Sequence, residues 1–234
     1  ARADAQYCSN GNGRDANATK LLINQPQDVK VVQWWTQMVA DGLALNTGRK
    51  TADAQAAFTA GRTAMTLEST GALRAFQTGA KFQVGTGFYP RSESGTSGGP
   101  IIGGASNWIM NARPKYEQNA AWSFIKFLNQ PENQAYWHTH TGYFPTGKKA
   151  LDDPSDVAWR QQFPQFQTAI DQLHQTKLDK ATQGCLLGVM PKARQVAEVA
   201  IEKSILKQAE PKKALHEAVA SIQPDIDQYN QQVH

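Results

Sequence analysis

The sequence offers no group of side chains with the types and spacing that catalysis requires. Its five histidines are His138, His140, His174, His216 and His234. His138 and His140 are two residues apart, which would place them on different sides of a helix, whereas a helical zinc motif needs a spacing of four. We therefore expect both to face solvent. The sequence also contains no P-loop and no helix-opening G-x-G-x-x-G. It therefore predicts no catalytic residue, metal ligand or cofactor.

Two polar residues at breaks in regular structure point instead to anion binding. Ser69 lies where a predicted strand passes into a helix N-terminus, which offers a hydroxyl, free backbone N–H groups and the positive end of the helix dipole. A plain N-cap is the simpler alternative for Ser69. Arg194 is expected in the first turn of a helix opened by Pro191, where the dipole disfavours a cation. A cation at that place suggests a binding role, with a solvated arginine as the commoner alternative.

Two further positions could present polar groups to a ligand. Gly103 and Gly104 interrupt a predicted strand, which permits either close approach of a ligand to the backbone or a bulge. Tyr143 lies in a tight turn between Gly142 and Pro145 and offers a phenol that can donate a hydrogen bond. Each of these features is weak alone, so their value depends on the elements that position them.

Apolar spacing, prolines and glycines predict a mixture of short strands and many helices, which is typical of the α/β class. The predicted strands are 63–67, 82–89 and 101–110. The predicted helices are 26–43, 51–60, 71–77, 116–129, 132–140, 154–176, 191–208 and 211–231. In the first helix, spacings of three and four predict an apolar face made of Val31, Trp34, Trp35 and Met38.

Composition excludes several classes of protein. The 234 residues carry 24 basic and 20 acidic side chains, and the basic ones are scattered, so no nucleic-acid partner is expected. No apolar stretch approaches the roughly 20 residues needed to span a bilayer. The two cysteines, Cys8 and Cys185, could pair in an oxidising compartment, but they form no framework and fit no metal spacing. Two unpaired thiols are the favoured interpretation, and pairing stays open.

Six short segments give the chain a resemblance to a known family. They are Gly61–Thr66, Ser69–Gly71, Ile101–Trp108, Pro131–Asn133, Thr141–Pro145 and Gly188–Arg194. In this order they resemble the glycerol-3-phosphate-binding proteins of bacterial ABC importers, within the maltose-binding-like superfamily. The Ile-Ile-Gly-Gly-Ala-Ser run and the Met-Pro-x-x-Arg segment are the most specific of them.

The resemblance implies a two-lobed, type II periplasmic-binding-protein-like α/β fold. By analogy, residues 1–88 are the first part of the C-terminal lobe, 89–148 the returning segment of the N-terminal lobe, and 149–234 the helical second part of the C-terminal lobe. Family members carry further residues upstream. The resemblance therefore implies a C-terminal lobe with an incomplete N-terminal lobe.

The resemblance also implies a ligand and its binding residues. Ser69, the backbone N–H near Gly104, Tyr143 and Arg194 would converge on the phosphate of sn-glycerol 3-phosphate or a glycerophosphodiester in the inter-lobe cleft. The expected partners are the permease subunits of an ABC importer, and the expected state is a monomer. The location would be periplasmic or otherwise extracytoplasmic, with a lipid anchor on a preceding segment as an open option.

Three alternatives remain beside this hypothesis. The first keeps the fold and replaces the ligand by a neutral sugar that stacks on tryptophans such as Trp108. Arg194 separates the two ligands, because a phosphate site needs its charge and a sugar site does not. The second is an enzyme on a similar scaffold, which the lack of an acid–base pair disfavours. The third is a chain that binds nothing by itself.

Overall fold

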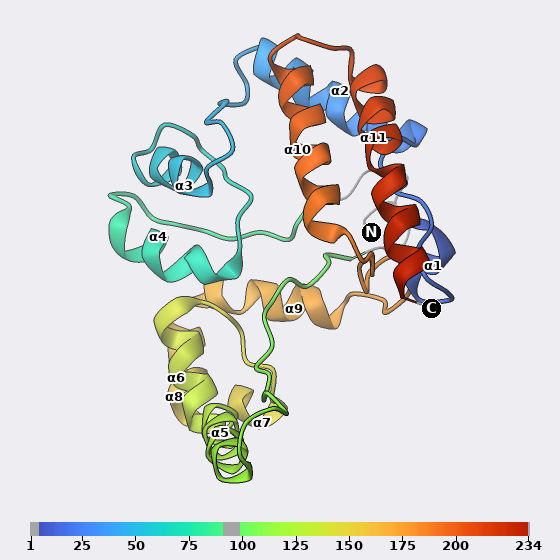
Figure 1. The fold of residues 1–234 in the computed structure, drawn as a ribbon. Coiled ribbons are helices and arrows are strands. Elements are labelled where there is room, and N and C mark those ends of the chain that lie inside the picture. Colours follow the sequence, from blue (N-terminus) through green and yellow to red (C-terminus); the bar gives the residue numbers. More distant parts are fainter. Residues whose placement is uncertain (1–4, 91–98, 234) are drawn as a thin grey trace. The chain divides into compact units, whose positions relative to one another are not determined.

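The regular structure of the described residues is almost entirely helical. A computed structural model describes residues 5–90 and 99–233 (Figure 1). The α-helices are α1 (Ser9–Gly13), α2 (Pro26–Ala40), α3 (Thr51–Thr59), α4 (Leu73–Gly79), α5 (Lys115–Leu128), α6 (Pro131–Thr141), α7 (Lys148–Leu151), α8 (Pro154–Gln162), α9 (Thr168–His174), α10 (Met190–Ile205) and α11 (Pro211–Gln232). The 3-10 helices are η1 (Thr70–Ala72) and η2 (Pro164–Phe166). No helix in this part of the chain is long and apolar enough to cross a lipid bilayer.

Local signals account for where the helices begin and end. Pro26, Pro131 and Pro211 each occupy a first helical position, because proline lacks an N–H that would be unsatisfied there. Gly142 ends α6 with a φ of 100°, a left-handed conformation that glycine adopts without strain. The predicted helix 154–176 is divided into α8, η2 and α9, because Pro164 cannot continue the hydrogen-bond ladder of α8.

The predicted strands 63–67, 82–89 and 101–110 are wrong. The described residues contain one isolated antiparallel bridge, between Cys8 and Leu21, and no longer ladder. The apolar side chains that suggested buried strands are exposed, with Met65 at 85% and Trp108 at 88%. A strand needs a neighbour for its backbone groups, and none of the described segments pairs with these three. Near the end of the second segment, the side-chain amide of Gln172 bonds both the N–H and the C=O of Tyr89.

The chain divides into two compact units, each built from separated pieces of sequence. Unit 1 comprises Ala1–Ala57, Arg91–Ile102 and Thr176–His234. Unit 2 comprises Phe58–Pro90 and Gly103–Gln175. These boundaries differ from the expected ones at 88/89 and 148/149. The first 57 residues contact the C-terminal helices, whereas residues 58–90 belong with unit 2. The assignment of residues to the lobes of a two-lobed protein stays a prediction.

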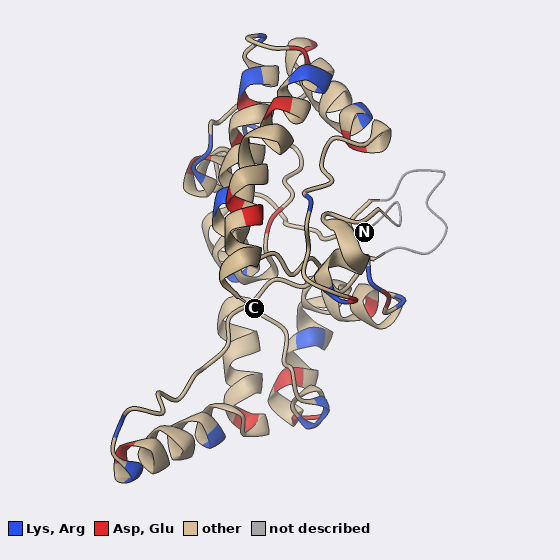
Figure 2. Ribbon diagram, turned by 45° about the vertical axis from the view of Figure 1, so that its right-hand side comes forward, with Lys and Arg blue, Asp and Glu red and all other residues tan. Residues whose placement is uncertain are grey.

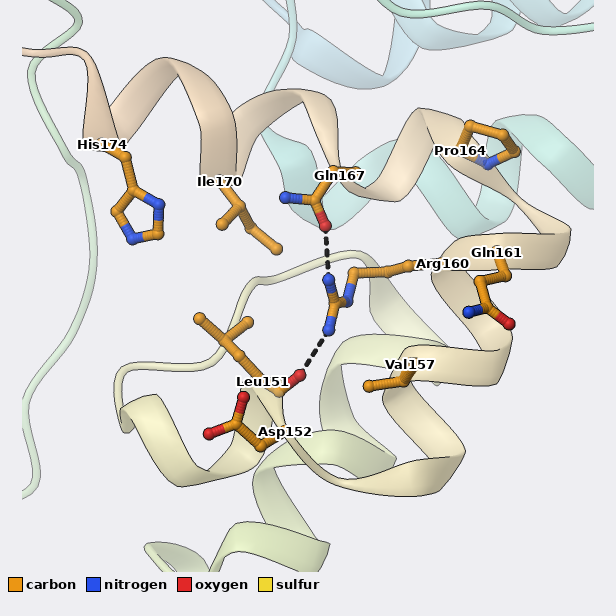
Figure 3. A pocket seen from close by; sticks show the side chains of 9 residues that line it. All are labelled: Leu151, Asp152, Val157, Arg160, Gln161, Pro164, Gln167, Ile170 and His174. Carbon is orange, nitrogen blue, oxygen red and sulfur yellow. Dashed lines mark hydrogen bonds between the residues drawn. The ribbon is translucent and has the colours of Figure 1, made fainter.

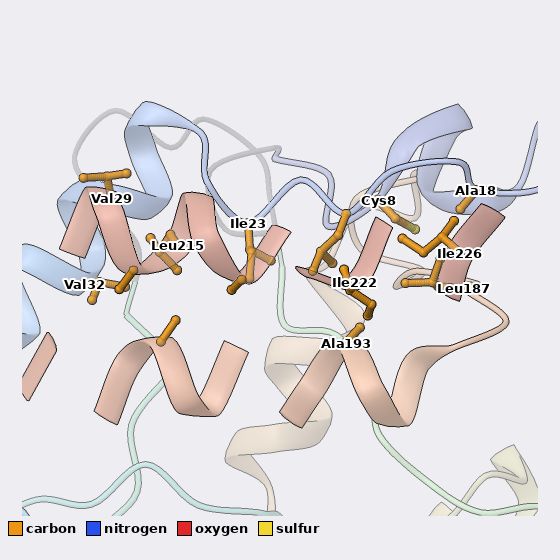
Figure 4. Close-up of a cluster of buried hydrophobic side chains, with 14 residues drawn as sticks. Cys8, Ala18, Ile23, Val29, Val32, Leu187, Ala193, Leu215, Ile222 and Ile226 are labelled. Carbon is orange, nitrogen blue, oxygen red and sulfur yellow. The ribbon is translucent and has the colours of Figure 1, made fainter. Parts of the chain in front are cut away.

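Unit 1 is organised around α2, α10 and α11, whose buried side chains form one apolar cluster with the segment before α2 (Figure 4). Ile222 and Ile226 of α11 are almost fully buried in it, and each contributes about 1.5–3 kcal/mol by leaving water. The predicted apolar face of α2 is wrong: Val29 and Val32 point into the cluster, whereas the tryptophans after them are exposed. The small valines fit against α10 and α11, and the face predicted from spacing lies on another side of the helix.

A disulfide joins Cys8 to Cys185, with Cα atoms 6.0 Å apart and a sequence separation of 177 residues. The favoured interpretation of two unpaired thiols is therefore wrong. The fold brings the two residues together: Asn12 accepts hydrogen bonds from the backbone N–H groups of Tyr7 and Cys8, at 2.7 and 3.0 Å, and donates to the carbonyl of Lys180 at 2.8 Å. This contact across the chain could not be read from spacing.

Basic and acidic residues are scattered over the chain without a large region of one sign (Figure 2). Several of the charges form ion pairs at the surface, including Lys180 with Asp15 at 2.5 Å and Lys192 with Asp225 at 2.6 Å. Exposed pairs of this kind contribute little stability, about 0–1 kcal/mol each. The charged side chains thus form a solvated surface that carries both positive and negative charge.

Candidate ligand-binding site

Ser69 and Tyr143 lie side by side in unit 2. The Ser69 hydroxyl accepts a hydrogen bond from the N–H of Gly71 at 3.3 Å and so acts as the N-cap of η1, as the sequence predicts. The ring of Tyr143 lies against Gly71, two residues further on. Both side chains are exposed, Tyr143 at 49%. The structure therefore brings two of the four predicted binding residues together, and both offer hydroxyl groups to solvent.

Glycines make this proximity possible. A Cβ added to Gly71 would lie 2.7 Å from the phenol oxygen of Tyr143, and one added to Gly142 would overlap the carbonyl of Thr70 and lie 3.0 Å from Cβ of Leu73. The contacts with the Tyr143 phenol and the Thr70 carbonyl are shorter than real Cβ contacts allow, and the one with Leu73 is tighter than most. The turn after α6 can thus pack directly against the start of η1, which fixes Tyr143 beside Ser69.

Glu68 affects which hydrogen-bond donors are available beside Ser69 and Tyr143. Its carboxylate accepts a hydrogen bond from the backbone N–H of Ser69 at 2.7 Å. This N–H is therefore occupied by the protein's own anion. An anionic ligand beside Ser69 and Tyr143 could accept hydrogen bonds from their two hydroxyls. To bind the backbone N–H of Ser69 as well, it would have to displace the Glu68 carboxylate.

Gly104 is not brought into contact with the other predicted residues of unit 2. It lies in an extended, exposed segment, and a Cβ built on it would meet no atom within 4 Å. The open backbone permits approach of a ligand, which was the expectation, but the structure shows no packing that would direct its N–H to Ser69 or Tyr143.

Arg194 lies in unit 1, on the exposed surface of α10. Because α10 begins at Met190, one residue earlier than Pro191 suggested, Arg194 is its fifth residue and lies at the start of the second turn. The expected position in the first turn is therefore wrong, and the repulsion from the helix dipole is correspondingly smaller. None of the described residues forms a hydrogen bond or ion pair with its guanidinium, which leaves all five donors available.

Unit 2 also contains a buried charged network that the sequence did not reveal. Asp156 is fully buried and lies 2.5 Å from Nδ1 of His138, while its other oxygen accepts from Nε of Arg160 at 2.7 Å. Arg160 further donates to Gln167 at 2.5 Å and to the carbonyl of Leu151. The expectation that His138 faces solvent is therefore wrong. Asp156 and Arg160, at a spacing of four, were the local signal available.

This network connects α6, α8 and the start of α9, and it does not present a reactive group. His138 reaches Asp156 from α6, and Arg160 extends the contact from α8 to Gln167 beside α9. Nε2 of His138 is buried and has no hydrogen-bond partner among the described residues. No described serine or cysteine bonds to the imidazole, so the nucleophile of a hydrolase triad is missing from this part of the chain.

An open hollow of about 490 Å³ lies beside the network (Figure 3). It is lined by Leu151, Asp152, Val157, Arg160, Gln161, Pro164, Gln167, Ile170 and His174. The guanidinium of Arg160 is directed toward Gln167 and Leu151 and is therefore already occupied. None of the four predicted binding residues lines this hollow, so it is separate from the candidate site.

The chain belongs to the bacterial extracellular solute-binding protein family, which it matches over residues 2–168. It is 33% identical, over 215 residues, to the sn-glycerol-3-phosphate-binding periplasmic protein UgpB of Escherichia coli K12. This match covers 91% of the chain and 49% of UgpB. The chain thus spans about half the length of the curated relatives it matches. The resemblance inferred from the six short segments is confirmed.

Solved structures show the same relationship at the level of the fold. UgpB from Mycobacterium tuberculosis, solved in complex with glycerophosphocholine, matches with a TM-score of 0.74 at 24% identity, over 92% of this chain and 51% of that one. The sugar-binding protein MalE of Xanthomonas citri matches with a TM-score of 0.73 at 19% identity, over 98% of this chain and 55% of that one. The predicted periplasmic-binding-protein fold is therefore confirmed, with a helix-rich chain in place of the expected strands.

Proposed function

We propose that the protein captures a glycerol-phosphate ester, sn-glycerol 3-phosphate or a glycerophosphodiester, for an ABC importer. The observation that carries this proposal is the 33% identity to a glycerol-3-phosphate-binding protein over 91% of the chain. The residues that bind the phosphate group would be Ser69, Gly104 through its backbone, Tyr143 and Arg194. The partners would be the permease subunits of the importer.

The chemistry of these residues suits a phosphate. Arg194 offers a planar fork of donors and a permanent positive charge, and no described residue occupies it. Ser69 and Tyr143 supply neutral hydroxyl donors that sit together beside Gly71. A single charge and several directional donors would recognise an ester phosphate while leaving its organic substituent to other contacts.

A neutral sugar is the second candidate. The maltose-binding-type structures share the fold at 19% identity or less, and Trp108 is exposed and able to stack on a sugar ring. The identity to a phosphate-ester-binding protein is higher, and the unpaired charge of Arg194 has no role in a neutral site. We therefore favour the phosphate ester. A periplasmic location, as in the name of the relative from Escherichia coli, and a monomeric state belong to the same proposal.

The test is calorimetric titration of the full-length protein with sn-glycerol 3-phosphate, glycerophosphocholine and maltose. Arg194→Ala should weaken binding of both phosphate esters about 10- to 150-fold, the equivalent of one charge-assisted hydrogen bond. Arg194→Lys should restore part of the loss, since an ammonium keeps the charge and loses the fork. Arg62→Ala, at another exposed arginine, is the matched control and should bind like the parent. Phosphate-ester binding unchanged by Arg194→Ala would refute the anion site and favour the sugar.

A further inference from the structure

One face of α8 contacts three neighbouring elements of unit 2. Asp156, Trp159 and Arg160 are three and four positions apart, which places them on the same side of the helix. Asp156 bonds a side chain of α6, Trp159 contacts a side chain of α4, and Arg160 bonds the residue that precedes α9. The elements that carry the two candidate hydroxyls, η1 with α4 and the turn after α6, are therefore both connected to α8.

The connection to α4 is a cation–π contact. The guanidinium carbon of Arg74 lies over the ring of Trp159, 4.6 Å from the ring centroid. The indole N–H is buried and has no hydrogen-bond partner in the part of the chain that the structure describes, so packing sets the position of the ring. The rings of Phe163 and Phe166 lie against it, at centroid distances of 4.3 and 5.5 Å. Arg74 is the second residue of α4, which continues directly from the turn that Ser69 caps, so this contact fixes that turn relative to α8.

The connection to α6 acts at the end of the helix from which Tyr143 follows. Asp156 is fully buried, and because a carboxylate can only accept, Nδ1 of His138 donates to it at 2.5 Å. The backbone carbonyl of His138 in turn accepts from the N–H of Gly142 at 2.8 Å, which closes the last turn of α6 directly before the tyrosine. Phe166 lies edge-on to the imidazole at 5.8 Å, so the ring that packs against the indole also packs against the histidine.

The two connected elements meet at the candidate site, where small shifts have consequences. The ring of Tyr143 lies against Gly71, and Gly142 lies against the carbonyl of Thr70. α6 packs against both α4 and α8. A shift of α4 or α6 would therefore move the hydroxyl of Ser69 relative to that of the tyrosine. Hydrogen bonds weaken steeply when their geometry departs from alignment, so such a shift would reduce the affinity for a ligand that bonds both.

We propose that Arg74 and His138 are positioning residues for the two hydroxyls of the site, with α8 as their common support. Arg74 holds η1 and its cap through Trp159. His138 holds the turn after α6 through Asp156. This inference rests on the proposed function, since it takes the two hydroxyls to bind the ligand, and it assigns a role in affinity to side chains that do not contact the ligand themselves.

His138→Phe in the full-length protein tests the connection to α6, because it keeps an aromatic ring and removes the hydrogen bond to Asp156. A positioning residue cannot cost more than the contact it positions. The affinity for sn-glycerol 3-phosphate, measured by calorimetry, should therefore fall roughly 2- to 10-fold, the range expected for the hydrogen bond of Tyr143. In a Tyr143→Phe background the same substitution should change affinity less than about 2-fold. His138→Asn, whose amide can still donate to the carboxylate, should bind within about 2-fold of the parent.

Arg74 tests the same support without disturbing the buried carboxylate, because it is only partly buried. Arg74→Met keeps an aliphatic stem and removes the cation over Trp159, so affinity should fall roughly 2- to 5-fold. In a Ser69→Ala background the loss should be less than about 2-fold. Arg74→Lys keeps a cation near the ring and should lose less than Arg74→Met. Arg113→Met, at an exposed arginine of unit 2 that pairs with Glu117, is the matched control and should bind like the parent.

The results separate this inference from the proposed function. If His138→Phe and Arg74→Met both bind like the parent while Tyr143→Phe loses affinity, the positioning role is wrong and the phosphate site stands. Equal losses with and without the hydroxyls would also overturn the role, because the variants would then act through general destabilisation. If Tyr143→Phe and Ser69→Ala themselves bind like the parent, the proposed contacts with the ligand are wrong, and the inference is wrong with them.

Discussion

The ring of Tyr143 lies directly against Gly71, where an added Cβ would come within 2.7 Å of the phenol oxygen and nearer still to two ring carbons. The contact joins the turn after α6 to the residues that follow Ser69. It places the two hydroxyl-bearing residues of the proposed phosphate site in a defined arrangement.

Gly71→Ala should displace Tyr143 and so weaken both stability and binding. Overpacking of this kind costs about 1–3 kcal/mol. Loss of the proposed hydrogen bond from the Tyr143 phenol to the ligand should reduce phosphate-ester affinity roughly 2- to 10-fold. Urea denaturation and calorimetry measure the two effects. Gly85→Ala is the matched control, because a Cβ at Gly85 meets no atom within 4 Å. If both variants behave alike, the contact between Tyr143 and Gly71 has no energetic importance.

Asp156→Ala should be among the most destabilising single substitutions in unit 2. It leaves His138 and Arg160 without the carboxylate that binds both, and breaking a buried pair from one side costs about 3–5 kcal/mol. The free energy of unfolding in urea gives the value. Asp152→Ala, at an exposed carboxylate four residues earlier, should change it by less than about 0.5 kcal/mol. A loss below about 1 kcal/mol for Asp156→Ala would contradict the role assigned to the network.

Removal of the disulfide should destabilise unit 1. For the double variant Cys8→Ser/Cys185→Ser we expect a loss of about 2–5 kcal/mol, because the cross-link closes a long loop and restricts the unfolded chain. Treatment of the parent protein with a reductant should lower its thermal midpoint to that of the variant, and should leave the variant unaffected. A parent protein whose midpoint is the same in both conditions would contradict the contribution of the bond.

The turn around Asp179 should make stability depend on acid pH. Backbone N–H donation from Thr182, supported by Ala181, lowers the pKa of Asp179 below its usual range. A carboxylate with a depressed pKa contributes stability above its unfolded pKa of about 3.9, and this contribution is lost as the pH falls through the lower, folded value. The parent should therefore be more stable than Asp179→Asn at pH 6, with the difference shrinking toward pH 3. A difference that is constant over this range would contradict the prediction.

The helices could be predicted from neighbouring residues. The predictions failed where the structure depends on a partner that is distant in the sequence. Pro26, Pro131 and Gly142 mark helix ends through their own backbone properties, so their positions could be read directly. The predicted strands needed partners for their backbone groups, which no property of residues 63–67 or 101–110 could reveal.

In the candidate site, too, the features set by adjacent residues were predicted and the contacts between distant residues were not. The Ser69 N-cap follows from adjacent residues and was predicted, as was the turn at Tyr143, but the contact between them depends on Gly71 and Gly142 meeting across the fold. His138 looked like a surface residue because its partner Asp156 is 18 positions away on another helix.

The bond between Cys8 and Cys185 encloses all of unit 2 in the sequence, because every residue of that unit lies between the two cysteines. Proteolytic nicking of the backbone once within unit 2 would therefore leave a single covalent molecule, with its two polypeptides held together through unit 1. Such a nicked protein would migrate as one species on a denaturing gel without reductant and as two after reduction. Unit 1 would keep the covalent connection between its first and last segments even when the polypeptide that connects them is cut.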